Sequence, residues 1–227
     1  HGGGIMLYQS SGYFDHININ NNESVSMGGG IWSAYGSKWT MANSVISDNL
    51  GFWNAGGIAL YENNDAGQGQ YEYCGDCSPV FINTHIKNNI TNDPWVGWGT
   101  GGGIMSWSSN PRFESCTIEG NQATDFGGGA TFWSGDPVFN NCILKNNYAD
   151  GYAGGIAIEE TYDGWPHGTL TMNGCVLAGN SAGIQGGAIG SLDPGLVSLI
   201  NCTVVDNIST GEYSGIYASN GKIINSI

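Results

Sequence analysis

The chain has few basic residues, with 5 Lys and Arg against 19 Asp and Glu and a net charge of −14 over 227 residues. Nucleic acids and anionic lipid surfaces are bound through basic patches, so this composition argues against both partners. The chain also lacks a run of 18 apolar residues, the length that a membrane-spanning helix requires. We therefore expect no nucleic-acid partner and no direct membrane insertion.

A helical pattern is also missing. No long window places apolar residues at the spacing i, i+3, i+4, i+7, whereas short β-branched and aromatic runs recur between Gly, Asn, Asp and Ser. Leu is scarce, which argues against leucine-rich repeats. The sequence therefore predicts an all-β protein.

What the chain does contain is a repeat of Gly pairs and Asn residues. The pairs stand at Gly3-Gly4, Gly29-Gly30, Gly56-Gly57, Gly102-Gly103, Gly128-Gly129, Gly154-Gly155 and Gly186-Gly187, with Ser214-Gly215 as a decayed eighth. Between them stand Asn22, Asn49, Asn89, Asn121, Asn147, Asn180 and Asn207, each three residues after an aliphatic residue. Successive Asn residues are 27, 40, 32, 26, 33 and 27 positions apart, a base period interrupted by insertions. A fixed period of this size is typical of a solenoid.

We predict a parallel β-helix of about eight coils, each with three short strands. Two further columns should point inward: one runs from Cys116 to Cys202, and the other, three residues earlier, holds Phe, Met and Leu. Because strand side chains alternate, this three-residue offset predicts a bend between the columns. The repeated Asn should mark a left-handed corner and form a hydrogen-bonded ladder. The Gly pairs should serve corners or close approaches that a Cβ would block.

Motifs such as Gly128-Gly129-Ala130 and Gly186-Gly187-Ala188-Ile189, alternating with Ile118-x-x-Asn121, resemble the repeats of polymorphic outer-membrane proteins. More broadly, they resemble the right-handed β-helix family, which includes surface adhesins and pectate-lyase-like domains. The resemblance covers the whole chain and implies a right-handed parallel β-helix. With the low charge, it also implies an extracellular or cell-surface location, associated with an outer membrane.

We expect one domain over residues 1–227, with insertions near 62–78, 90–100 and 159–168. Neither end carries a capping unit, so we expect a fragment of a longer protein or a unit covered by neighbours.

The six cysteines form two groups. Cys116, Cys142, Cys175 and Cys202 stand in the inward column, where we expect a file of small apolar thiols. Cys74 and Cys77 stand in the largest insertion, and we predict a local disulfide between them if the protein is exported. No second Cys or His pair accompanies them, so we expect no zinc site.

The chain contains no convergent acid and base set, so no catalytic residue is nominated. Its basic side chains are Lys38, Lys87, Arg112, Lys145 and Lys222, and Arg112 replaces Val of a repeated Pro-x-Phe motif. The enzymatic alternative is a polysaccharide lyase or glycoside hydrolase of the pectate-lyase-like class. We expect no cofactor and no metal site, although the acids of 62–65 and several loops, Asp125 among them, leave Ca²⁺ open.

Aromatic residues give the best candidate surface. After each Gly pair, alternation predicts an outward file across neighbouring coils, made of Met6, Tyr8, Trp32, Tyr61, Met105, Trp107, Trp133, Ile189 and Tyr217. The candidate binding residues within it are Tyr8, Trp32, Tyr61, Trp107 and Trp133; whether insertions cover them stays open. Such rows suit sugar stacking or protein packing. We therefore predict a non-catalytic structural or adhesive module whose partner is a protein neighbour in a surface assembly or an extracellular polysaccharide.

Overall fold

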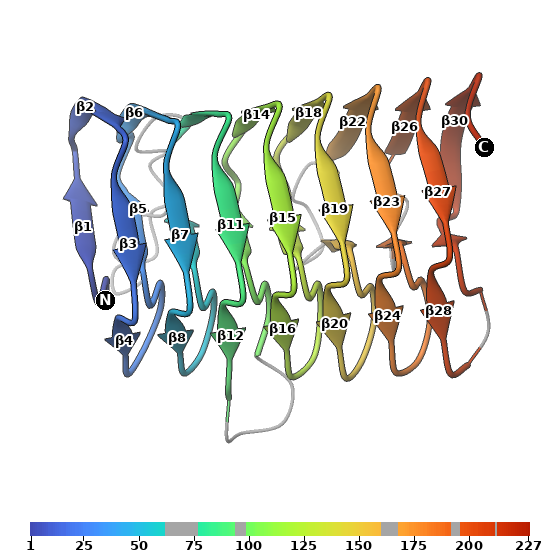
Figure 1. The fold of residues 1–227 in the computed structure, drawn as a ribbon, viewed down its shortest axis with the longest axis horizontal. Coiled ribbons are helices and arrows are strands. Elements are labelled where there is room, and N and C mark those ends of the chain that lie inside the picture. Colours follow the sequence, from blue (N-terminus) through green and yellow to red (C-terminus); the bar gives the residue numbers. More distant parts are fainter. Residues whose placement is uncertain (62–76, 94–98, 160–167, 192–195, 212) are drawn as a thin grey trace, which may run out of the picture.

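The computed structural model describes residues 1–61, 77–93, 99–159, 168–191, 196–211 and 213–227. Within these ranges the chain is a right-handed parallel β-helix whose strands all pair in parallel, coil on coil (Figure 1). Each complete coil carries four strands rather than the three that the repeat predicts, because a two-residue strand follows the Asn corner. The strands form four sheets, which we name A to D in chain order.

Sheets A and B each hold eight strands. Sheet A consists of β1 (Ile5–Tyr8), β5 (Ile31–Ala34), β9 (Ile58–Tyr61), β13 (Ile104–Trp107), β17 (Ala130–Trp133), β21 (Ile156–Glu159), β25 (Ile189–Ser191) and β29 (Ile216–Tyr217). Sheet B consists of β2 (Ser11–Asp15), β6 (Lys38–Ala42), β10 (Val80–Ile82), β14 (Arg112–Glu114), β18 (Val138–Asn140), β22 (Thr169–Asn173), β26 (Leu196–Ile200) and β30 (Asn220–Ile224).

Sheets C and D each hold seven strands. Sheet C consists of β3 (Asn18–Asn20), β7 (Val45–Ser47), β11 (His85–Lys87), β15 (Thr117–Glu119), β19 (Ile143–Lys145), β23 (Val176–Ala178) and β27 (Thr203–Val205). Sheet D consists of β4 (Glu23–Ser24), β8 (Leu50–Gly51), β12 (Ile90–Thr91), β16 (Gln122–Ala123), β20 (Tyr148–Ala149), β24 (Ser181–Ala182) and β28 (Ile208–Ser209).

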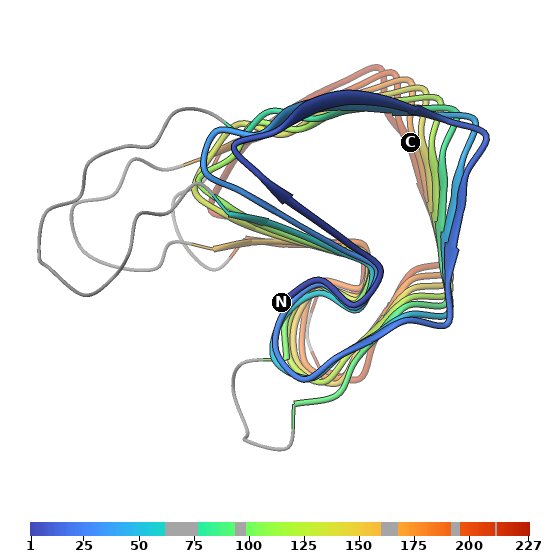
Figure 2. The same cartoon turned by 90° about the vertical axis from the view of Figure 1, so that its left-hand side faces the viewer.

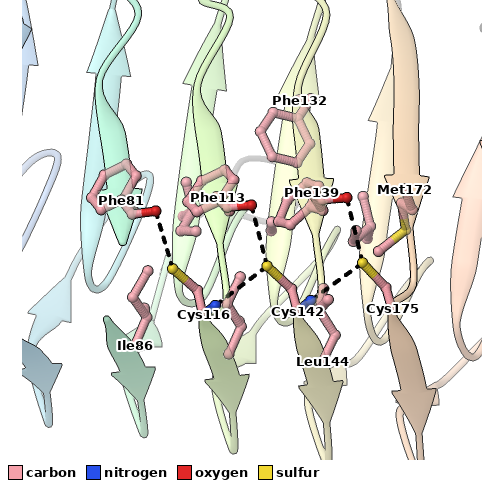
Figure 3. Packing of buried hydrophobic residues seen from close by; sticks show 14 of the residues in the cluster. Phe81, Ile86, Phe113, Cys116, Phe132, Phe139, Cys142, Leu144, Met172 and Cys175 are labelled. Atoms are coloured by element: carbon pink, nitrogen blue, oxygen red, sulfur yellow. Dashed lines mark hydrogen bonds between the residues drawn. The ribbon is translucent and has the colours of Figure 1, made fainter. Parts of the chain in front are cut away.

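The core is a set of files that run along the helix axis. Phe81, Phe113 and Phe139 stack with ring centroids 4.9 and 4.5 Å apart, and the Cys file lies beside them (Figure 3). The backbone N–H of Cys116 donates to the sulfur of Cys142 at 3.4 Å, and Cys142 repeats this contact with Cys175. The predicted inward columns and the file of buried thiols are therefore confirmed.

The predicted bend between the Phe and Cys columns is also present. The residue just before the Cys column has positive φ in each coil, for example 54° at Ser115 and 53° at Asn141. This left-handed residue turns the chain from sheet B to sheet C, and it restores the inward direction of the next side chain.

The Asn ladder is confirmed, but its left-handed residue is displaced by one position. Each column Asn from Asn22 to Asn180 donates from Nδ2 to Oδ1 of the Asn in the next coil, at 3.0 Å from Asn89 to Asn121 and at 3.0 Å from Asn121 to Asn147. Positive φ occurs at the residue before, such as Asn88 at 54° and Asn146 at 55°. The column Asn satisfies buried backbone, while its neighbour makes the turn.

One predicted register is wrong. Alternation after the Gly pair predicts that Ile189 faces outward, yet Ile189 pairs with Ile156 in sheet A and lies in the main core. Gly187 and Ala188, rather than Gly186 and Gly187, occupy the places of the Gly pair, since the N–H of Gly155 donates to Gly187 O and that of Ile156 to Ala188 O. A one-residue shift reverses which face a strand side chain occupies.

The predicted insertions contain most of the residues outside the described ranges. Across them the coils keep register, with Ile58 opposite Ile104 and Ile156 opposite Ile189. The insertions therefore lengthen individual coils without changing how the coils stack.

Candidate functional site: an aromatic pocket on the outer face of sheet A

The outline of each coil turns inward just before sheet A. Viewed along the axis, the outer face of sheet A and the turn that follows sheet D face each other across this re-entrant corner (Figure 2). The Gly pairs form the corner, where the backbones of adjacent coils approach so closely that a Cβ on Gly129 would lie 2.6 Å from Gly155 O. A second apolar cluster, separate from the core inside the coils, fills part of this space and includes Trp32, Met105 and Trp133.

A pocket of about 400 Å³ opens in the same place. The described residues that line it come from both walls and from the corner between them: Met27, Trp53, Asn54, Tyr61, Asp93, Trp107 and Trp133. Its volume is within the range of small-molecule sites, and its lining is largely aromatic with an amide and a carboxylate.

The sheet A wall is a file of three aromatic side chains at the last position of successive strands. Tyr61 of β9 pairs with Trp107 of β13, which pairs with Trp133 of β17. The ring centroids are 5.7 Å apart for Tyr61 and Trp107 and 4.7 Å apart for the two Trp rings, which meet edge to face. Nε1 of Trp133 donates to Oε2 of Glu159 at 2.8 Å, so a carboxylate from the next coil fixes the ring.

Trp53 and Asn54 lie between β8 and β9 and supply the opposing surface. Trp53 is half exposed, whereas Asn54 is buried and its Oδ1 accepts from Oγ1 of Thr100 at 2.9 Å. Burial raises the pKa of the Tyr61 hydroxyl, and a hydrogen bond with Asn54 opposes this effect. The Tyr61 hydroxyl is therefore a neutral hydrogen-bonding group at physiological pH.

Two carboxylates stand at equivalent positions beyond sheet D. Ile90 pairs with Gln122, so Asp93 and Asp125, each three residues later, stand at matching places of adjacent coils. Burial, and after it the charge of Asp93, raise the pKa of Asp125 to about 6. Asp93 lines the pocket, and its carboxylate places negative charge at the pocket edge. Asp125 lies beside it in the next coil.

The structure brings together three of the five predicted binding residues, Tyr61, Trp107 and Trp133. Tyr8 lies in the same file but is cut off by Ala34, and it is half exposed beside Tyr35 with ring centroids 4.5 Å apart. Trp32 belongs to the neighbouring outward file and is only 7% exposed, with the His1 ring stacked on it at 5.1 Å. Part of the predicted stripe is therefore buried, and another part forms one wall of the pocket.

Sequence reasoning missed Met27, Trp53, Asn54 and Asp93. Trp53, Asp93 and Asp125 share one place in the repeat, two residues beyond each sheet D strand, so the repeat itself could have aligned them. Their position opposite sheet A follows only from the inward turn of the coil.

The predicted disulfide lies partly outside the described residues, because Cys74 is not among them. Cys77 is buried, and its Sγ donates to the backbone oxygen of Tyr61 at 3.4 Å. The bond between Cys74 and Cys77 stays a prediction.

In the described ranges no group of three or more His, Cys, Asp or Glu side chains gathers as a metal site. The acidic stretch 62–65, whose oxygen atoms could serve as Ca²⁺ ligands, lies outside those ranges. The described part of the chain also contains no helix long and apolar enough to cross a membrane.

Stacked coils with an aromatic pocket on one lateral face define a β-helix protein. A family model described as the right-handed β-helix region matches residues 63–188, more than half of the chain. The chain belongs to the right-handed β-helix family. No curated protein and no solved structure matches it.

Proposed function

We propose that this β-helix is a non-catalytic module that binds a glycan through the aromatic pocket. The observation that carries the proposal is the convergence of Trp53, Tyr61, Trp107 and Trp133 around one pocket of about 400 Å³. Aromatic rings stack on the apolar faces of sugar rings, and a few polar groups then orient the hydroxyls. Asn54 and Asp93 are placed to do this.

The scaffold supports binding because it holds the aromatic file in a fixed geometry. Tyr61, Trp107 and Trp133 stand in three paired strands of a sheet, and Glu159 orients the last ring. A side chain that is already ordered loses little conformational entropy when a ligand binds.

The composition supports a location on a cell surface or in the extracellular space. Only 11% of the residues are charged and Gly is abundant, as is common in polar β-solenoids exposed to solvent. A surface-exposed rod with a lateral sugar site would act as an adhesive module.

The first experiment is a binding screen of the protein against oligosaccharides of different composition, followed by titration calorimetry of those retained. We expect Trp53→Ala and Trp107→Ala each to weaken binding about tenfold or more, as the loss of one stacking contact predicts. Trp53 is half exposed, so its replacement tests binding with little risk to folding.

Tyr13→Ala is the matched control, because Tyr13 is an exposed aromatic residue of β2 in sheet B, away from the pocket. It should bind like the original protein. Retention of full affinity by both Trp variants, or absence of any oligosaccharide binding, would overturn the proposal.

Glycoside hydrolysis is a second candidate, and one observation favours it. Asp93 and Asp125 occupy matching places on adjacent coils, and the pKa of Asp125 is raised by burial and by the Asp93 charge, as the pKa of a general acid would be. Arg112, the base considered for a lyase, is instead exposed on sheet B and pairs with Glu114 at 3.5 Å.

Release of reducing ends from a bound oligosaccharide would establish hydrolysis. If the protein is a hydrolase, Asp125→Asn should abolish release while binding persists. An oligosaccharide that is bound and recovered intact would leave the non-catalytic function standing alone.

A further inference from the structure

We propose that the glycan recognised by this pocket is cationic: its sugar rings carry amino groups, held by the aromatic faces of the pocket and by the carboxylate of Asp93. This inference rests on the proposed function and names the ligand class of the same site. The distribution of charge, the rings that line the pocket and the pair of carboxylates at its edge each support it.

The distribution of charge over the four sheets is uneven. All five Lys and Arg residues lie in sheets B and C: Lys38 in β6, Lys87 in β11, Arg112 in β14, Lys145 in β19 and Lys222 in β30. The described residues that line the pocket include Asp93 and no basic side chain. The pocket side therefore lacks the counter-charge that an anionic sugar would need.

The aromatic lining favours a cation over a neutral group. A cation is attracted to the face of an aromatic ring, most strongly to Trp, and the attraction grows when water is excluded. Three Trp rings and one Tyr ring line this pocket. An ammonium group next to them would have both aromatic faces and the Asp93 carboxylate as partners.

The two carboxylates also gain from a cation. Burial, and after it the charge of Asp93, raise the cost of ionising Asp125, as its pKa of about 6 reflects. An ammonium beside Asp93 would offset this repulsion, whereas a neutral hydroxyl would not. Across the whole chain, a net charge of −14 would repel a polyuronate and attract a polyamine sugar.

The test compares two ligands that differ mainly in charge, a glucosamine hexasaccharide and the N-acetylglucosamine hexasaccharide, titrated calorimetrically into the full chain at about pH 6.5. We expect the glucosamine ligand to bind about tenfold more tightly, and salt to weaken it selectively. Tetramethylammonium, which is charged at every pH and has no sugar ring, should compete with it.

Asp93→Asn should remove most of the preference for the glucosamine ligand, because losing the carboxylate should lower the affinity for glucosamine far more than that for N-acetylglucosamine. Asp206→Asn is the control, because it removes one negative charge at an exposed position in another part of the rod, between β27 and β28. It should leave the preference intact.

The outcomes separate the two proposals. Equal affinity for both hexasaccharides, lost in Trp107→Ala, would overturn the cationic inference and leave the glycan function standing. Direct binding of tetramethylammonium with no affinity for any oligosaccharide would overturn the glycan function, and with it the amino-sugar assignment. Loss of the preference in Asp206→Asn as well would show long-range attraction to the acidic rod, and would overturn the role of the pocket.

Discussion

At the scale of single residues, the clearest energetic cost close to the pocket is the burial of a carboxyl group, that of Asp125, beside the pocket residue Asp93. Burial and the nearby Asp93 carboxylate raise its pKa from 3.8 to about 6. Its ionised form is therefore less stable in the folded protein than in the unfolded chain, and this cost is present when the pH is above about 6.

The consequence for stability is a pH-dependent effect of Asp125→Asn. Between about pH 4 and 6 the folded protein holds a proton on Asp125 that the unfolded chain releases, so the free energy of unfolding falls as the pH rises through this window. We expect the variant to raise the melting temperature at pH 7.5 and to change it little at pH 4.

Asp206→Asn is the comparison for net charge, since Asp206 is exposed. It should shift the melting temperature far less at pH 7.5. A gain for Asp125→Asn that is equal at both pH values would contradict the assignment.

At the scale of elements, coils are joined by columns of identical side chains and by close backbone contact. The column Asn residues bridge sheets C and D, and the Gly pairs bring the corner of one coil against the next. Both devices are local rules that repeat in every coil. Their loss at one coil should weaken its neighbours.

Asn121→Ala tests the ladder. Asn121 is fully buried; its Nδ2 donates to Asn147 Oδ1 and Ile86 O, and its Oδ1 accepts from the backbone N–H and the Nδ2 of Asn89. Truncation leaves these groups unsatisfied, so we expect a loss of about 3 kcal/mol in the free energy of unfolding, measured by urea denaturation. Asn18→Ala, at an exposed position of β3, should cost much less; equal losses would count against the ladder.

Gly129→Ala tests the close approach at the corner. The added Cβ would lie 2.6 Å from Gly155 O and 3.2 Å from Cγ of Asn147, and the carbonyl belongs to backbone that cannot swing away. We expect a loss of about 2 kcal/mol, as for other overpacked sites, again read from urea midpoints. Gly215→Ala in the decayed eighth repeat has no atom within 4 Å of the new Cβ and should be near neutral. If Gly129→Ala leaves the free energy of unfolding unchanged, the corner has room for a Cβ and the close-approach argument is wrong.

At the scale of the whole molecule, charge is the dominant asymmetry. The chain has 19 acids and 5 bases, and the bases all lie on sheets B and C. Like charges on a rod repel along its length, which destabilises the folded state and is reduced by salt. The same imbalance favours a cationic ligand over an anionic one.

Salt should therefore stabilise the protein at neutral pH. Raising the sodium chloride concentration from about 10 mM to 150 mM should increase the melting temperature by a few degrees, because the Debye length falls to about 8 Å. The same step at about pH 4, where many carboxylates are neutral, should have a smaller effect. An equal shift at both pH values would indicate a general salt effect instead of relief of repulsion.

The sequence by itself determined the repeat, the parallel β-helix, the inward columns and the Asn ladder, because each follows from residue types that recur at the same place in successive coils. Alternation in strands was enough to place Tyr61, Trp107 and Trp133 on one outward file. The same offset after the Gly pair also places Ala34 in this file, between Tyr8 and Tyr61, but alternation did not show that Ala188 shifts the register of Ile189. Only the tertiary structure decided that the coil bends inward at the Gly pairs, because that bend brings Trp53 and Asp93, beyond sheet D, to face sheet A and turns an aromatic stripe into a pocket.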